Sequence, residues 1–125
     1  MSGKSNIVFK SLSTLGSAAK SAASEGSASG KRGMFLAGEH VLGVANTRVP
    51  HESGDLQRSG AVSQDDSTGA TAVSYDTDYA VRQHEDESLS HDAGRESKFL
   101  ENSMISERET ALAIVAQAVK KGMGL

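Results

Sequence analysis

One proline, Pro50, separates two segments of opposite hydrophobic periodicity in this 125-residue chain. Between Met34 and Val49 the apolar residues recur at helical spacing, whereas beyond Gly54 they alternate with polar residues as in β-strands. The residue before a proline is pushed out of the α region, so the helix must end by Val49. The sequence therefore predicts an α+β fold: a small antiparallel β-sheet, a hairpin plus edge strands, packed against a long N-terminal helical region and a long C-terminal helix.

The composition limits how large a core this chain can build. A chain of 125 residues is expected to form a single domain, 1–125. Only 37% of its residues are hydrophobic and 4% aromatic, with no Trp and 13 Gly. A small core of this kind predicts modest stability as a monomer. We therefore expect association with further copies of the chain to supply part of the missing burial.

The residue inventory gives no grounds for an enzyme. The absence of cysteine excludes disulfides, thiolate zinc sites and cysteine nucleophiles. No G-x-S-x-G elbow, phosphate-binding loop or HExxH spacing occurs, so we expect no catalytic, cofactor or metal residues. A net charge of −3 does not indicate a general affinity for nucleic acid. No apolar run reaches the ~20 residues of a membrane helix, and no signal peptide is indicated, so a soluble, intracellular product is expected.

The N-terminal half is expected to be mainly helical. Residues 1–10 form a polar arm, in which Ile7-Val8-Phe9 is either an edge strand or a frayed start. Residues 11–30 are rich in Ser, Ala and Gly; they fit a helix with a thin apolar face, or a flexible linker, with a break near Gly26 to Gly33. A better helix follows over Met34 to Arg48. Its apolar stripe comprises Met34, Ala37, Val41, Val44 and Ala45, and His40 beside it is expected to be a boundary residue.

A β-hairpin is predicted between Gly54 and Tyr79. Its strands are 61–64 and 70–75, joined by the polar residues 65–69 that end in a glycine. The larger side chains of the second strand, Thr71, Val73 and Tyr75, share one face and are expected to face the helices. Two strands alone are marginally stable in water, so the hairpin needs a third strand, packed helices or a neighbouring subunit.

The C-terminal part combines a polar loop with an amphipathic helix. Residues 84–96 are expected to form a mobile acidic loop, and Glu85, Asp86, Glu87 and His91 in it are candidates for a subunit interface. One helix is predicted from Ser97 to Lys121, with Gly122 as its C′ residue. Its apolar face comprises Leu100, Met104, Ala111, Val115, Ala118 and Val119, widened by Phe99, Ile105, Leu112 and Ile114.

Several short motifs occur in an order that resembles a known family. They are Val49, Pro50, Gly54, Leu56 and Ser59, which fit V-P-x-x-[ST]-G-x-L-[RK]-x-S, followed by Tyr79 and then by Phe99-Leu100-Glu101. Over roughly the last three-quarters of its length the chain resembles the small neck proteins of long-tailed bacteriophages, known as tail-completion, tail-terminator or minor capsid proteins. It departs from their pattern at His51-Glu52 and in the loop after His84.

The resemblance implies a structural role in the virion. Proteins of that family form rings, usually of six copies, which cap the tail tube or join it to the connector below the portal and let DNA pass. The implied partners are other copies of the chain, the connector or stopper protein and the tail tube protein. The implied location is the neck of the virion, after synthesis in the host cytoplasm, with no membrane and no specific DNA binding.

Two alternatives stay open from the sequence. The motif around Pro50 also fits an ordinary helix-to-strand connection, in which Gly54 allows a sharp turn and Leu56 packs under the helices. The whole chain also fits a small non-viral adaptor or regulatory protein that binds a partner through its amphipathic C-terminal helix.

Overall fold

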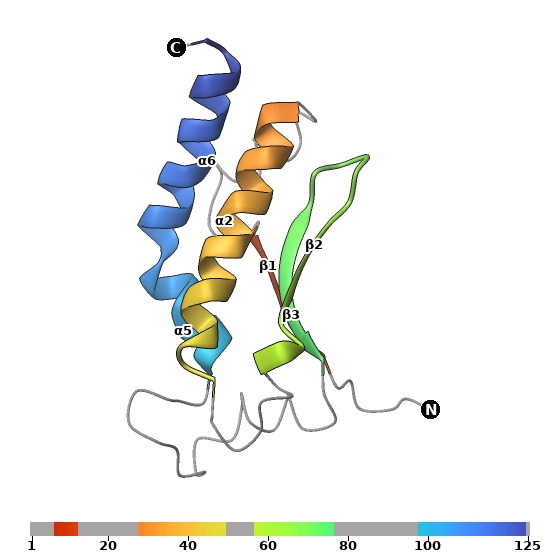
Figure 1. Ribbon diagram of the computed structural model, residues 1–125, viewed down its shortest axis with the longest axis vertical. Helices are drawn as coiled ribbons and strands as arrows, with labels where there is room; N and C mark the ends of the chain where they lie inside the picture. Colours follow the sequence, from red (N-terminus) through yellow and green to blue (C-terminus); the bar gives the residue numbers. More distant parts are fainter. Residues whose placement is uncertain (1–6, 13–27, 50–56, 77–97, 125) are drawn as a thin grey trace.

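A computed structural model describes residues 7–12, 28–49, 57–76 and 98–124 of the chain. The elements follow in the order β1 (Ile7–Ser11), α2 (Ala28–Asn46), β2 (Ala61–Gln64), β3 (Thr71–Asp76), α5 (Phe99–Ser106) and α6 (Arg108–Gly122) (Figure 1). This is an α+β fold, as the two kinds of periodicity on either side of Pro50 predicted.

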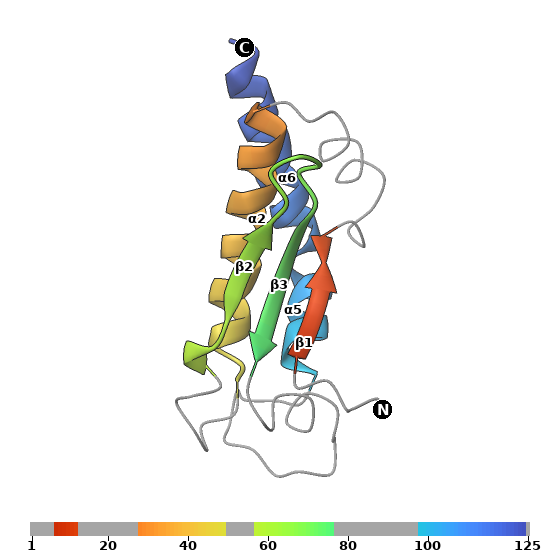
Figure 2. The same ribbon diagram turned by 90° about the vertical axis from the view of Figure 1, so that its right-hand side faces the viewer.

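The three strands form one antiparallel sheet in the order β1-β3-β2. β2 and β3 are the predicted hairpin, paired from Ala61 opposite Ser74 to Gln64 opposite Thr71. β1 pairs with the other side of β3, from Ile7 opposite Asp76 to Ser11 opposite Ala72. The interpretation of Ile7-Val8-Phe9 as an edge strand is therefore confirmed, and β1 is the third strand that the hairpin required (Figure 2).

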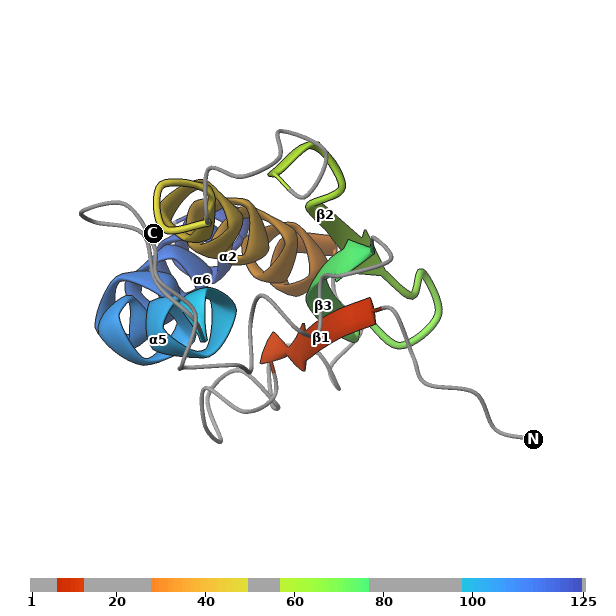
Figure 3. The same cartoon turned by 90° about the horizontal axis from the view of Figure 1, so that it is seen from below.

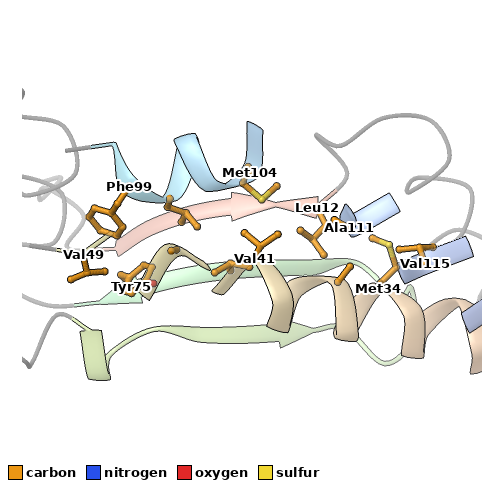
Figure 4. Close-up of a cluster of buried hydrophobic side chains, with 13 residues drawn as sticks. Leu12, Met34, Val41, Val49, Tyr75, Phe99, Met104, Ala111 and Val115 are labelled. Atoms are coloured by element: carbon orange, nitrogen blue, oxygen red, sulfur yellow. The ribbon is translucent and has the colours of Figure 1, made fainter. Parts of the chain in front are cut away.

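The helices cover one face of this sheet. α2 packs on the sheet and has α6 on its other side, whereas α5 contacts both α2 and β1 (Figure 3). Thr71, Val73 and Tyr75 of β3 are at most 2% exposed, which confirms that the larger side chains of this strand face the helices. The core also contains Leu12 after β1, Val49 after α2, and side chains from every helix: Met34, Ala37, Val41, Ala45, Phe99, Leu100, Met104, Ala111 and Val115 (Figure 4).

Helix α2 begins earlier than its sequence predicted. The expected break between Gly26 and Gly33 is wrong over the described part, because α2 runs without interruption from Ala28 through Gly30 and Gly33. Both glycines are buried, and a methyl group on Gly33 would lie 3.0 Å from the Cβ of Ala118 and 3.1 Å from the Cα of Val115. These glycines therefore do not interrupt the helix; Gly33 allows α6 to approach it closely.

The predicted single C-terminal helix is wrong in one respect: it is divided at Glu107 into α5 and α6. The division allows α5 to pack near β1 while α6 lies along α2. Ile105, placed on the apolar face by its spacing, is 68% exposed. The predicted C′ role of Gly122 is also wrong, since Gly122 is the last helical residue and Gly124 has the positive φ of 79° that this role requires.

Candidate assembly surfaces

The motif residues that the structure describes have structural positions. Val49 is 2% exposed, and both Phe99 and Leu100 are fully buried in the same core. The hydroxyl of Ser59 accepts a hydrogen bond of 3.0 Å from the backbone N–H of Asp76. Other predicted residues lie outside the described part of the chain: Pro50, Gly54, Leu56, Tyr79 and the candidate interface residues Glu85, Asp86, Glu87 and His91.

Tyr75 forms a polar contact at one end of the core. Its ring meets Phe99 edge-on, with ring centroids 5.0 Å apart (Figure 4), and its hydroxyl donates a 2.6 Å hydrogen bond to Oδ1 of Asn46. Burial raises the pKa of the Tyr75 hydroxyl well above its usual range. The tyrosine is thus held neutral, and the arrangement ties β3 to the end of α2 rather than presenting a reactive group.

His40 and Glu107 make the contact between α2 and the α5–α6 junction. Nε2 of His40 and Oε1 of Glu107 are 2.6 Å apart, in a pair that is about three-quarters buried at Glu107 and two-thirds at His40. The hydrogen bond with His40 holds the pKa of the Glu107 carboxyl below its ordinary value, against the opposing effect of partial burial. The expectation that His40 is a boundary residue is confirmed, and its partner 67 residues away explains why.

The loop between β2 and β3 is held by Asp65. One carboxylate oxygen of Asp65 accepts hydrogen bonds from the hydroxyl of Ser67 at 2.7 Å and its backbone N–H at 2.8 Å. These bonds, together with one from the backbone of Thr68, lower the pKa of Asp65. The loop is therefore a closed turn whose carboxylate is satisfied internally.

The described part of the chain contains neither a cluster of potential metal ligands nor a helix suited to crossing a membrane. Within ranges 7–12, 28–49, 57–76 and 98–124, no three His, Asp or Glu side chains lie together as metal ligands would. Among the helices of this part of the chain, none has both the length and the apolar character needed to cross a bilayer.

The most distinctive surface is a groove of about 780 Å³ between α2 and α6, here called the α2–α6 groove. It is lined from α2 by Ala28, Ser29, Arg32 and Leu36, and from α6 by Thr110, Ala113, Ile114, Gln117, Ala118, Lys121 and Gly122. At one end of the groove the two helices approach closely, because Gly122, which has no side chain, lies directly against Ser29. Leu36 is 43% exposed in it, and such exposure of a large apolar side chain is typical of a contact surface.

Sequence reasoning did not find this groove or the His40–Glu107 pair. The sequence feature that could have indicated the groove is Leu36, because it is a large apolar residue outside the buried stripe that contains Met34 and Ala37. The pair gave no local signal, because its members are 67 residues apart in the chain.

Comparison with known proteins gives no support for a family: no protein-family model, no curated protein and no solved structure matches this chain.

Proposed function

We propose that this chain is a structural, non-catalytic subunit of a ring at the head–tail junction of a long-tailed bacteriophage. The single observation that carries the proposal is the three-stranded sheet with β3 in the centre and β1 and β2 at its edges. Edge strands present unpaired backbone groups, which can be paired by a strand from a neighbouring copy. Repeated edge pairing around a rotation axis would close a ring.

The hydrogen-bond pattern tells which groups of β2 are available for such pairing. The N–H of Asp65 donates to the carbonyl oxygen of Ala70 at 2.9 Å, which fixes these two as a hydrogen-bonded pair. In an antiparallel ladder the hydrogen-bonded pairs alternate, so Ser63 and Ala61 direct their backbone groups to β3. Val62 and Gln64 then direct theirs away from the sheet, and both are positioned for a neighbouring strand.

The fold also accounts for the motif residues that the structure describes. Val49 is buried just after α2, Ser59 holds the start of the hairpin, and Phe99 and Leu100 anchor α5. The ordered motifs therefore coincide with packing points of one small domain. In the proposed ring, the connector or stopper protein and the tail tube protein contact its two faces, and the mildly acidic chain lets DNA pass without specific binding. Its place is the neck of the virion.

A second candidate is an adaptor that binds a partner helix. The α2–α6 groove favours it, because an exposed apolar groove between two helices is a known form of helix recognition. Size-exclusion chromatography with light scattering distinguishes the two candidates. Ring-sized particles of the chain, alone or on tail tubes, support the neck protein; a stable 1:1 complex with a soluble regulator supports the adaptor.

Blocking one sheet edge tests the ring directly. Val62→Pro removes the outward N–H of β2, and Val62→Ala is its matched control, because it shortens the same half-buried side chain but keeps that N–H. We expect ring particles in electron micrographs of the control and their loss in the proline variant, with circular dichroism showing both folded. Rings that persist in Val62→Pro would show that the β2 edge is not the subunit contact.

A further inference from the structure

The exposed face of α2 beside the α2–α6 groove has a charge pattern that is complementary to itself. Three contacts establish that the two helices are antiparallel: Gly122 lies against Ser29, Ala118 against Gly33, and Glu107 bonds His40. Positions along the groove can therefore be matched between α2 and α6. The end near Ser29 and Gly122 is called the upper end, and the end near His40 and Glu107 the lower end.

The types of side chain on α2 follow a definite order from the upper to the lower end of the groove. On α2, Arg32, Leu36 and Glu39 are spaced at i, i+4 and i+7, and so share one face of the helix. This face is opposite the buried stripe that contains Met34, Ala37 and Val41, and all three side chains are exposed. The order on α2 is therefore basic, apolar, acidic.

The side of the groove formed by α6 repeats part of this order. Lys121 and Ile114 are seven residues apart and lie on one side of α6, whereas Glu107, a further seven residues back, is the N-cap residue before the helix. Lys121 and Ile114 line the groove, and Glu107 stands at its lower end in the pair with His40. Both sides of the groove thus have a basic upper end and an apolar middle. Beyond the lower end of its lining, Glu39 is exposed on α2, and Glu107 is paired with His40.

We propose that a second copy of this chain occupies the groove, related to the first by a two-fold axis that passes near Leu36 and Ile114. A two-fold axis across the helices reverses the direction of the partner, so that the basic end of each copy meets the acidic end of the other. Arg32 then faces Glu39 of the second copy, and the reverse contact occurs at the same distance from the axis. The apolar middle parts meet and exclude water from Leu36.

The geometry of the helices suits this arrangement. Arg32 and Glu39 are seven residues apart on α2, about 10 Å along the helix, so they are too far apart for a close pair within one chain. Small residues line the groove, among them Ala113 and Ala118, which leaves room for the side chains of a second helix pair. The product is four antiparallel helices around a shared apolar centre.

The pairing is independent of the proposed ring. It uses the faces of α2 and α6 directed away from the sheet, whereas the ring contact is proposed at the edge of β2. A two-fold contact joins two copies and does not by itself continue around a ring.

Sedimentation equilibrium of the full chain, at about 1 to 300 µM, tests the pair. We expect reversible dimers whose dissociation constant rises about tenfold or more in Leu36→Glu, since this change places two carboxylates, one from each copy, near the axis. Ile105→Glu is the matched control, because Ile105 is 68% exposed on α5 and outside the groove lining. A monomer throughout this range, or association that Leu36→Glu leaves unchanged, overturns the proposal.

A charge exchange tests the two-fold register. Arg32→Glu alone and Glu39→Arg alone each bring like charges together twice in the dimer, so each is expected to weaken it about tenfold. The double variant Arg32→Glu with Glu39→Arg restores opposite charges across the axis and is expected to recover dimerisation. A double variant as weak as the single ones overturns the antiparallel register. Circular dichroism of each variant separates a loss of association from a loss of folding.

Discussion

At the scale of single residues, the polar side chains of this protein mainly fasten elements to one another. Tyr75 joins β3 to the end of α2, and Ser103 joins α5 to its neighbourhood by donating to the carbonyl of Phe99 at 2.6 Å and accepting from Arg48 at 3.3 Å. Each of these groups is satisfied by a named partner, as buried polar groups must be. Their effect is therefore on stability and should be measurable by titration and mutation.

Tyr75→Phe tests the buried hydroxyl. Loss of the bond to Asn46 is expected to lower the free energy of unfolding by about 0.5–1.5 kcal/mol near neutral pH. The pKa of Tyr75 is raised in the folded state, so its contribution is complete below the ordinary tyrosine pKa of about 10 and is lost as the pH rises above it. Urea unfolding at several alkaline pH values should therefore show a steeper loss in the wild type than in Tyr75→Phe; parallel curves would contradict this account.

Glu107→Gln tests the pair with His40 in the acid range. The folded pKa of Glu107 is lowered, so its stabilisation is present above the ordinary glutamate pKa of about 4.3 and disappears as the pH falls through the lower folded value. Because the pair is partly exposed, we expect a difference in unfolding free energy below about 1 kcal/mol at pH 6. Chemical denaturation from pH 6 to 3 should show the difference shrinking; an increase towards low pH would have the wrong sign.

At the scale of elements, glycine decides how closely α2 and α6 pack. Gly33 and Gly43 lie in the same helix but have different surroundings. A methyl group at Gly33 would press on Ala118 and on the backbone of Val115, whereas one at Gly43 would meet nothing within 4 Å. The same substitution should therefore have opposite effects at the two positions.

Gly33→Ala is expected to cost about 1–3 kcal/mol, because α6 must move away from α2. Gly43→Ala is its matched control and is expected to stabilise the protein by about 0.5–1 kcal/mol, through the better helix propensity of alanine at an exposed site. Urea denaturation of the two variants provides the measurement. Equal effects at both positions would mean that the close approach at Gly33 does not exist in solution.

At the scale of the whole molecule, the core of the described residues contains two aromatic rings, Tyr75 and Phe99, among aliphatic side chains. Its buried members include Ala37, Ala45 and Ala111, while the large side chains of Leu36 and Ile105 remain at the surface. A fold of this kind gains stability when copies associate and cover such side chains, and that gain depends on protein concentration.

The melting temperature is therefore expected to rise with concentration. Between about 2 and 200 µM, a change of a few degrees is expected if association adds on the order of 1–3 kcal/mol. Differential scanning fluorimetry or calorimetry measures it, and the groove variant Leu36→Glu should lack most of the rise. A melting temperature independent of concentration would indicate that each copy is complete by itself.

Predictions from the sequence agree with the structure where the interactions are between residues close in the chain. Local signals succeeded: Pro50 predicted that the helix ends by Val49, and alternation in Thr71, Val73 and Tyr75 predicted the face of β3 that meets the helices. Predictions from local patterns failed where a contact with a distant element determines the conformation around a residue. Gly30 and Gly33 resemble a helix break in the sequence, but α2 continues through them, with α6 packed against Gly33.

The sequence by itself determined the α+β class, the hairpin and the apolar stripes, because periodicity and turn chemistry act between residues close in the chain. Tertiary structure alone decided that α2 and α6 lie antiparallel, that His40 meets Glu107, and that Arg32 and Leu36 line a groove with Lys121 and Ile114. Those arrangements depend on contacts between segments about 70 to 90 residues apart, and the hydrophobic periodicity of one segment does not show which distant segment it contacts.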